Sequence, residues 1–240
     1  MVFLIFNPHI VSISKPRSGE ERPTKKYIEF KSGTFRYYDK EKEENVDVKL
    51  PIEFVVIDEL ATVKGWSDKF QCGIYSNEVH STLTEQLIVN AFKGGGIATG
   101  IYGEIKDKIK SEGGRYCKSV YAVMGDELVN FQLVGAALSA WIEKEVNFTR
   151  PKFTVKSLAE GKKGATVYKI PVFEISEATQ EEWDVATKID KEILQPYFDR
   201  TEKKEDDIKV CTADDIQPAR EVEEKEEPEE EEVKVDDLPF

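Results

Sequence analysis

The stretch IEFVVIDELATVKGW, residues 52–66, decides the fold class of this chain. Its β-branched and mostly apolar composition predicts one long strand. A second segment, FQCGIY at residues 70–75, can pair with it across the short connection at residues 67–69. A long strand followed at once by a pairing strand indicates antiparallel β-structure.

Similar β signals lie on both sides of this pair of segments. Residues 27–30 and 34–38 have the spacing of a hairpin, and so do residues 152–160 and 165–175, with glycine in both turns. Further strands are predicted at residues 2–6, 46–50, 87–92, 97–103, 115–124 and 127–135. Many short strands with glycine-rich turns predict a mostly β, closed or nearly closed architecture, with extended hairpins and one or two short helices.

Two segments have helical composition. The first covers residues 136–146. The second begins at Ser176, an N-cap candidate, although Thr179 stands where a complete capping box would have Glu or Gln. Pro196 is expected to end this helix. Its predicted apolar face consists of Trp183, Ala186, Ile189, Ile193 and Leu194.

The net charge of -13 is concentrated in the last forty residues. Residues 201–240 contain 17 acidic and 6 basic side chains, whereas residues 1–200 contain 30 acidic and 28 basic ones. No aromatic residue precedes Phe240 in the acidic segment. Such a segment buries too little apolar area to offset the entropy of ordering. We therefore predict a folded domain at residues 1–200 and a disordered acidic tail at residues 201–240.

The cysteines and the apolar segments suggest a reducing cytoplasm. Cys72, Cys117 and Cys211 are widely spaced and odd in number, which argues against a disulfide framework, and no C-x-x-C or histidine pair indicates zinc. Residues 1–6 lack the basic start and the cleavage site of a signal peptide. No stretch approaches the length of about 18 apolar residues that a membrane span needs. We expect no membrane partner.

Motifs for catalysis are weak. The glycine run KGGGIATG, residues 93–100, lacks the Lys-Ser or Lys-Thr of a phosphate loop, and it is interpreted as a bend between strands. Neither of the two histidines lies in a nucleophile motif. Asp58, Glu59 and Glu104 are the carboxylates that an enzyme would use. We predict no catalytic residue, no cofactor and no metal.

Two windows combine a positive charge with aromatic residues. Residues 15–40 contain eight basic and four acidic side chains, and residues 93–118 contain six and three. Lysine and arginine can follow the phosphates of a single strand while aromatic rings stack on its bases, although an aromatic residue on a strand is often part of the core. At residues 34–39, alternation should expose Arg36 and Tyr38, because a buried unpaired arginine is costly. The predicted nucleic-acid-binding residues are Lys25, Lys26, Lys31, Arg36, Tyr38, Trp66, Lys93, Lys106, Lys108, Lys110, Arg115, Tyr116, Lys118 and Tyr121.

The sequence given ends in an apolar tip after its long acidic segment. A terminal phenylalanine can fill a small apolar pocket while its carboxylate meets a cation at the rim. The proline limits the backbone freedom that binding removes, and the aspartates steer the tip toward a basic surface. The predicted partner-binding residues are Asp236, Asp237, Leu238, Pro239 and Phe240.

The tip DDLPF closely resembles the C-terminal tip of bacterial single-stranded DNA-binding proteins. A β-rich body followed by a glutamate-rich tail is similar to the single-stranded DNA-binding proteins that bacteriophages encode. This resemblance implies an OB-fold-like Greek-key barrel that coats single-stranded DNA without sequence specificity during replication, recombination and repair. It also implies that the tail recruits a polymerase, helicase, primase or nuclease. The body differs from the bacterial protein, which leaves the strand order and the individual DNA contacts open.

Two other functions are compatible with the sequence. The chain could be an interaction adaptor that mimics the host tail without binding DNA. It could also be an enzyme of nucleic-acid metabolism that uses the tail for recruitment. Salt-sensitive binding to single strands, no DNA binding, and magnesium-dependent turnover would distinguish the three. A homodimer is left open.

Overall fold

The computed structural model describes residues 22–203, with side chains described through Asp199. All of these residues belong to the first of two units in the chain, Met1–Asp207. The strand predicted at residues 2–6 and nearly all of the predicted tail lie outside the described residues. No helix in the described part of the chain is long and apolar enough to cross a membrane.

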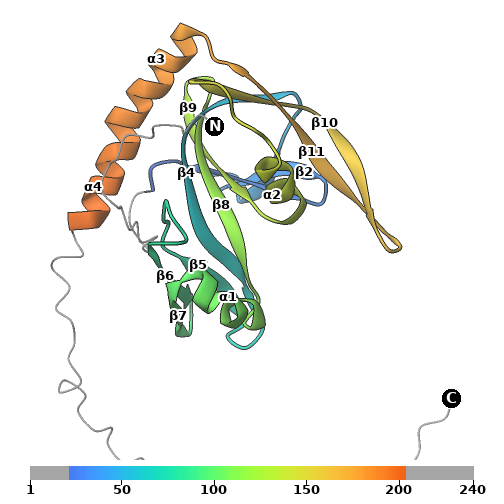
Figure 1. Cartoon of the computed structure of the whole chain (residues 1–240), viewed down its shortest axis with the longest axis vertical. Coiled ribbons are helices and arrows are strands. Elements are labelled where there is room, and N and C mark those ends of the chain that lie inside the picture. The colour runs from blue at the N-terminus through green and yellow to red at the C-terminus, as the bar shows by residue number, and fades with distance from the viewer. Residues whose placement is uncertain (1–21, 204–240) are drawn as a thin grey trace, which may run out of the picture. The chain divides into compact units, whose positions relative to one another are not determined.

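Strands dominate the described residues, which confirms the prediction of a mostly β protein (Figure 1). Both predicted hairpins are present, and the one at residues 152–175 is longer than predicted. The strands are β1 (Lys26–Lys31), β2 (Thr34–Asp39), β3 (Glu44–Val48), β4 (Ile52–Ser67), β5 (Cys72–Ser76), β6 (Gln86–Ala91), β7 (Gly95–Ile101), β8 (Gly114–Met124), β9 (Glu127–Leu133), β10 (Pro151–Lys163) and β11 (Thr166–Glu177).

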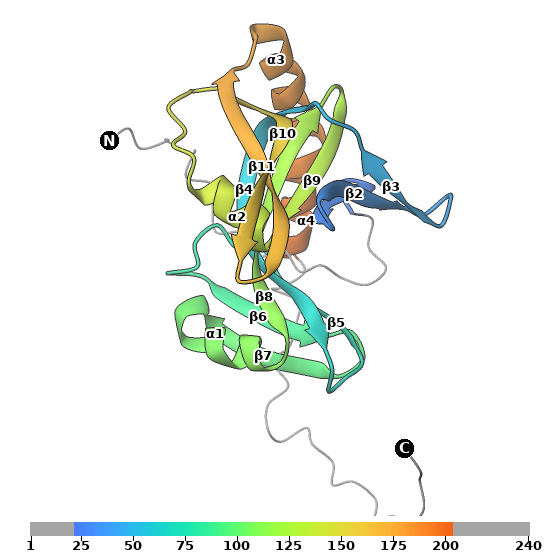
Figure 2. The same ribbon diagram turned by 90° about the vertical axis from the view of Figure 1, so that its right-hand side faces the viewer.

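The strands form one mixed, open sheet in the order β3-β2-β1-β9-β8-β4-β5-β6-β7, with β10 and β11 off this path. β1 runs parallel to β9, and the other neighbours are antiparallel. One edge of β4 pairs with β8, while the other pairs with β10 near its start and with β5 near its end. The long strand predicted from residues 52–66 therefore links two ends of the sheet. Figure 2 shows that the end with β10 and the end with β5 lie apart. Closure into an OB-type barrel stays a prediction.

Within residues 22–203, three helical segments accompany the sheet, one more than the upper number predicted. They are α1 (Tyr102–Ser111), α2 (Gly135–Ile142) and a continuous segment made of α3 (Gln180–Ile189), the π-helix η1 (Asp190–Leu194) and α4 (Gln195–Lys203). α2 was predicted, but α1 was not, because residues 97–103 were assigned to a strand. β7 instead ends at Ile101, and α1 begins without a side-chain cap. Packing of Ile105 and Ile109 onto the sheet holds α1 in place.

The helix predicted from Ser176 begins later and continues further than expected. Thr179 is its N-cap, and it forms a complete capping box with Glu182: each accepts a hydrogen bond from the other's backbone N–H, at 3.2 and 2.9 Å. Pro196 does not end the helix. It lies in the first turn of α4, directly after the wider π-helical turn, where the missing proline N–H is tolerated.

Two hydrophobic cores lie on one face of the sheet. The first, near β10, contains the stacked rings of Phe54, Trp141 and Phe153 and is covered by α2. The second, near β5, contains Val63 and Ile74, and α1 covers it. β4 and β8 contribute residues to both cores.

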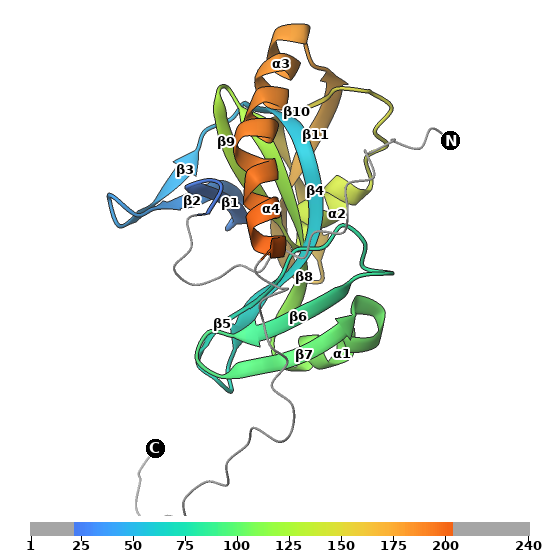
Figure 3. The same cartoon turned by 90° about the vertical axis from the view of Figure 1, so that its left-hand side faces the viewer.

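The segment from α3 to α4 covers the opposite face at only one end of the sheet. Leu194 and Phe198 from this segment pack on Leu60 and Tyr121 from the sheet. Figure 3 shows the segment in front of β4, β8 and β9, and ending above β5 and β6. Among the described residues, no helix packs on this face at the β5 end. That uncovered face is where a ligand can approach.

Candidate nucleic-acid interface

Three aromatic side chains lie on the uncovered face, and we call Trp66, Tyr75 and Phe92 the aromatic surface. In the ladder, Trp66 pairs with Gly73, and Gly73 is two residues before Tyr75 on β5. Tyr75 in turn pairs with Asn90, and Asn90 is two residues before Phe92. Cross-strand partners share a face of the sheet, and so do residues two apart along one strand. The three rings therefore project toward the same side from β4, from β5 and from the residue directly after β6.

Two of these rings are exposed to solvent. Trp66 is 55% exposed and Phe92 is 59% exposed, while Tyr75 is half-buried. The ring of Phe92 lies over Gly73, since a Cβ at that position would stand 3.0 Å from it. The ring centroids of Phe92 and Tyr75 are 4.5 Å apart. The glycine thus leaves the space that the ring fills, and the surface presents flat apolar faces on which bases could stack.

Two cations border the aromatic surface. Lys64 of β4 and Arg115 of β8 stand opposite each other on the same face. The ammonium group of Lys64 contacts Glu29 and Gln132, so its charge is already partly balanced. Arg115 is exposed and forms no ion pair with any described residue. It is therefore the cation best placed to contact a phosphate beside the rings.

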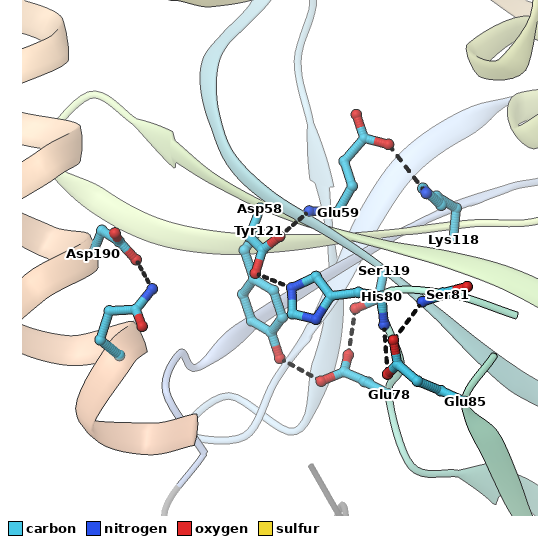
Figure 4. Close-up of polar contacts among 11 residues, drawn as sticks. Asp58, Glu59, Glu78, His80, Ser81, Glu85, Lys118, Ser119, Tyr121 and Asp190 are labelled. Carbon is cyan, nitrogen blue, oxygen red and sulfur yellow. Dashed lines mark hydrogen bonds and ion pairs between the residues drawn. The ribbon is translucent and has the colours of Figure 1, made fainter. Parts of the chain in front are cut away.

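Tyr121 was predicted to stack on bases, and this prediction is wrong because the residue is buried. It is 1% exposed, and its hydroxyl donates a 2.9 Å hydrogen bond to Glu78 (Figure 4). Ser119 donates to the same carboxylate and accepts a 2.8 Å hydrogen bond from Asn130. Burial raises the pKa of Tyr121 well above its usual range, so the hydroxyl stays a donor. Tyr121 belongs to a buried polar cluster and is not open to DNA.

The carboxylates considered for an enzyme lie in different places. Asp58 stands 3.1 Å from the Nε2 atom of His80, and Glu59 forms a 3.3 Å ion pair with Lys118 (Figure 4). These two carboxylates are on opposite faces of β4, because they pair with successive residues of β8. Glu104 is exposed on α1. Among the described residues, no three His, Cys, Asp or Glu side chains are grouped as a metal site requires.

The predicted residues between positions 15 and 40 lie far from the aromatic surface in the strand order. β1, β9 and β8 stand between β2 and β4. Tyr38 is 52% exposed on β2, as predicted, and Arg36 is half-buried. Lys25 and Lys26 each pair with a glutamate, and Lys31 is exposed. The strand order therefore separates the side chains of β2 from the aromatic surface, although Lys64 at its border reaches Glu29 of β1.

The predicted residues between positions 93 and 118 separate into groups. Lys106 and Lys110 line a groove between α1 and β8 together with Arg115, whereas the exposed Lys108 does not line it. Lys93 is exposed in the turn after Phe92.

The last two residues of this window are partly engaged elsewhere. Tyr116 is half-buried against Tyr102, with ring centroids 5.1 Å apart. Lys118 is held by its pair with Glu59. Neither lies on the aromatic surface, because both belong to the face of β8 that carries the two cores.

Sequence reasoning missed Tyr75 and Phe92, although a signal existed for both. Alternation in residues 70–75 places Cys72 and Ile74 on one face and Tyr75 on the other. Phe92 likewise shares a face with the polar Asn90. An aromatic ring among glycine and polar residues on one side of a strand was the available clue.

The predicted partner-binding tip, residues 236–240, lies outside the described residues. Comparison of the chain with protein-family models, with curated proteins and with solved structures found no match.

Proposed function

We propose that this protein binds single-stranded DNA without sequence preference and protects it during replication, recombination and repair. The observation that carries the proposal is the aromatic surface, with two exposed rings beside Arg115 on a face that no described helix covers. Rings stack on bases and the guanidinium contacts phosphate. Stacking tolerates any base because every base has a π-face, which suits a coat protein.

The proposal includes an OB-type architecture and a bacteriophage origin. OB folds bind oligonucleotides on the exposed face of their strands, and the aromatic surface has that placement. The mostly β composition is compatible with such a fold. The origin rests on the resemblance of the tail and of its tip, residues 236–240, to those of single-stranded DNA-binding proteins.

The acidic segment is proposed to recruit replication or recombination proteins. Residues 201–240 carry a net charge of -11, from 17 acidic and 6 basic side chains, and Phe240 would anchor a partner. Deleting Phe240 should abolish binding to such proteins and leave DNA affinity nearly unchanged. A biosensor with immobilised full chain and a replication protein in solution would measure this. Equal binding of both forms would contradict the role of the tip.

The DNA-binding proposal is tested first by titrating the full chain with oligo(dT) and with duplex DNA of equal length at low and moderate salt. Trp66 is exposed whereas Trp141 is 6% exposed, so tryptophan fluorescence should respond to ligand on the aromatic surface. We expect tight binding to the single strand that weakens as salt rises. No binding to either DNA would contradict the proposal and leave the adaptor function.

A matched pair of variants tests the position of the interface. Trp66→Ala should weaken binding of a dye-labelled oligo(dT) by about 1–3 kcal/mol, because it removes one stacking ring. Tyr38→Ala removes an aromatic ring of similar exposure on β2 and should leave the affinity unchanged. The reverse pattern would place the interface at the first basic window.

A further inference from the structure

Most of the charged side chains that line the groove between α1 and β8 are cations. Its volume is about 530 Å³, within the range of roughly 300–1,000 Å³ that small-molecule sites span, so it can hold a nucleotide-sized group. Three of its lining side chains are cations, and one is an acid. The lining consists of Tyr102, Lys106, Asp107, Ile109, Lys110, Gly113, Gly114 and Arg115.

The groove borders the aromatic surface directly. Arg115 lines the groove and also stands opposite Lys64 on the face that carries the three rings. Gly113 packs against the backbone of Trp66, where a Cβ would stand 2.1 Å from the carbonyl oxygen. This close approach leaves no space for a side chain at position 113. A strand that leaves the ring of Trp66 across the edge of β8 therefore meets Arg115 and then the groove.

The charges in the groove lack partners within the described part of the chain. Lys106 and Lys110 are one helical turn apart, and neither forms an ion pair there. Like charges at this spacing disfavour a helix slightly, and although the helix dipole favours Lys110 in the last turn, helix stability does not explain Lys106. The nearby Glu112 already pairs with Lys69 at 3.8 Å. An anion in the groove would relieve the repulsion between the lysines.

We propose that the groove binds the phosphate backbone of the single strand where it continues beyond the aromatic surface. This inference rests on the proposed function and adds a path to it: bases stack at Phe92 and Trp66, and the backbone then crosses Arg115 to reach Lys110 and Lys106. The proposal also assigns different roles to the lysines of α1. Lys106 and Lys110 contact the DNA, whereas Lys108 on the same helix does not.

The test measures the affinity of the full chain for oligo(dT) of increasing length, from about 4 to about 16 nucleotides, the range of site sizes known for one OB fold. Lys106→Ala and Lys110→Ala should each weaken binding of the long oligonucleotides severalfold and leave the shortest one unaffected. For the long oligonucleotides, each variant should make the plot of log affinity against log salt less steep by about 0.7, the change expected for one lost phosphate contact with a single strand. Asp107→Asn should have the opposite effect and strengthen binding of the long oligonucleotides.

Lys108→Ala is the matched control, because it removes the same charge from the same exposed helix. It should leave the affinity and the salt slope unchanged. If it weakens binding as much as Lys106→Ala, the effect is one of general charge and the groove proposal is wrong. If the wild-type chain binds oligo(dT) and the two groove variants match it at every length, the groove proposal fails alone. If the wild-type chain binds no oligonucleotide, the proposed function fails with it.

Discussion

Tyr121 and Trp66 lie on the same face of the long β4–β8 ribbon, yet one is 1% exposed and the other 55%. At the Tyr121 end, the segment from α3 to α4 covers the face, with Phe198 packed edge-on against Tyr121 at a centroid distance of 5.8 Å. At the Trp66 end, no described helix covers it. The same strand pattern thus gives a core residue in one place and a candidate ligand surface in the other.

Polar groups are also stabilised in different ways at the two ends. Under the helical cover, the buried carboxylate of Glu78 accepts hydrogen bonds from Tyr121 and Ser119, because an unpaired buried charge would be costly. At the open end, Arg115 needs no partner within the protein because water solvates it. The comparison therefore predicts opposite responses to mutation: stability should change at the covered end and DNA affinity at the open end.

The largest effect is expected from removing the cover. Phe198→Ala deletes a ring that is 5% exposed and should lower the free energy of unfolding by about 3–5 kcal/mol. Urea unfolding followed by circular dichroism measures this. A loss of under about 1 kcal/mol would show that α4 contributes little to burying Tyr121.

A smaller effect is expected inside the polar cluster. Tyr121→Phe keeps the ring but removes the hydroxyl that donates to Glu78, and it should cost about 1–3 kcal/mol of stability. Affinity for oligo(dT) should not change under conditions where the variant is folded. A weaker affinity with unchanged stability would return Tyr121 to the interface.

At the open end, Phe92→Ala should weaken DNA binding while changing stability little. Because Phe92 is 59% exposed, its removal should change stability by no more than about 1 kcal/mol. Oligo(dT) binding should weaken by about 1–3 kcal/mol, measured by the anisotropy of a labelled oligonucleotide. Unchanged affinity would remove Phe92 from the aromatic surface and weaken the contrast between the two ends.

The smallest effect concerns pH and the pair of His80 with Asp58. Their hydrogen bond raises the pKa of His80 above its ordinary value of 6.5, and burial opposes this in part. A raised pKa in the folded state means that the protonated form stabilises the fold. This contribution is fully present below pH 6.5 and is lost as pH rises through the raised pKa.

His80→Gln tests this contribution. The difference in unfolding midpoint between wild type and variant should shrink from about pH 5 to about pH 8. The effect should be modest because the side chain of His80 is 39% exposed. A difference that grows with pH would contradict the sign of the pKa shift.

Local sequence patterns predicted most of the strands but fewer of the helices. β4 was expected at residues 52–66 and spans Ile52–Ser67, because its β-branched run is unambiguous. α1 was missed because it lacks a side-chain cap and follows β7 directly, and its stability depends on Ile109 reaching the core. The N-cap at Thr179 required recognising Glu182 three residues later as its partner.

The sequence identified basic and aromatic windows as candidate contacts, but composition could not divide them into sites. Lys106, Lys108 and Lys110 look alike in the sequence, and only the packing of α1 against β8 places two of them in a groove. Tyr75 and Phe92 both lie outside the two windows, and the ladder of β4, β5 and β6 places them beside Trp66.

By itself, the sequence determined the strands, their alternation between two faces, the two hairpins and the concentration of acidic charge in residues 201–240. These features depend on neighbours within a few residues, so local stereochemistry specifies them. Only the tertiary structure decided which aromatic residues of one face are covered and which are open. That choice depends on where the segment from α3 to α4 packs, more than fifty residues beyond Tyr121 in the chain, and no local pattern around Tyr121 or Trp66 contains it.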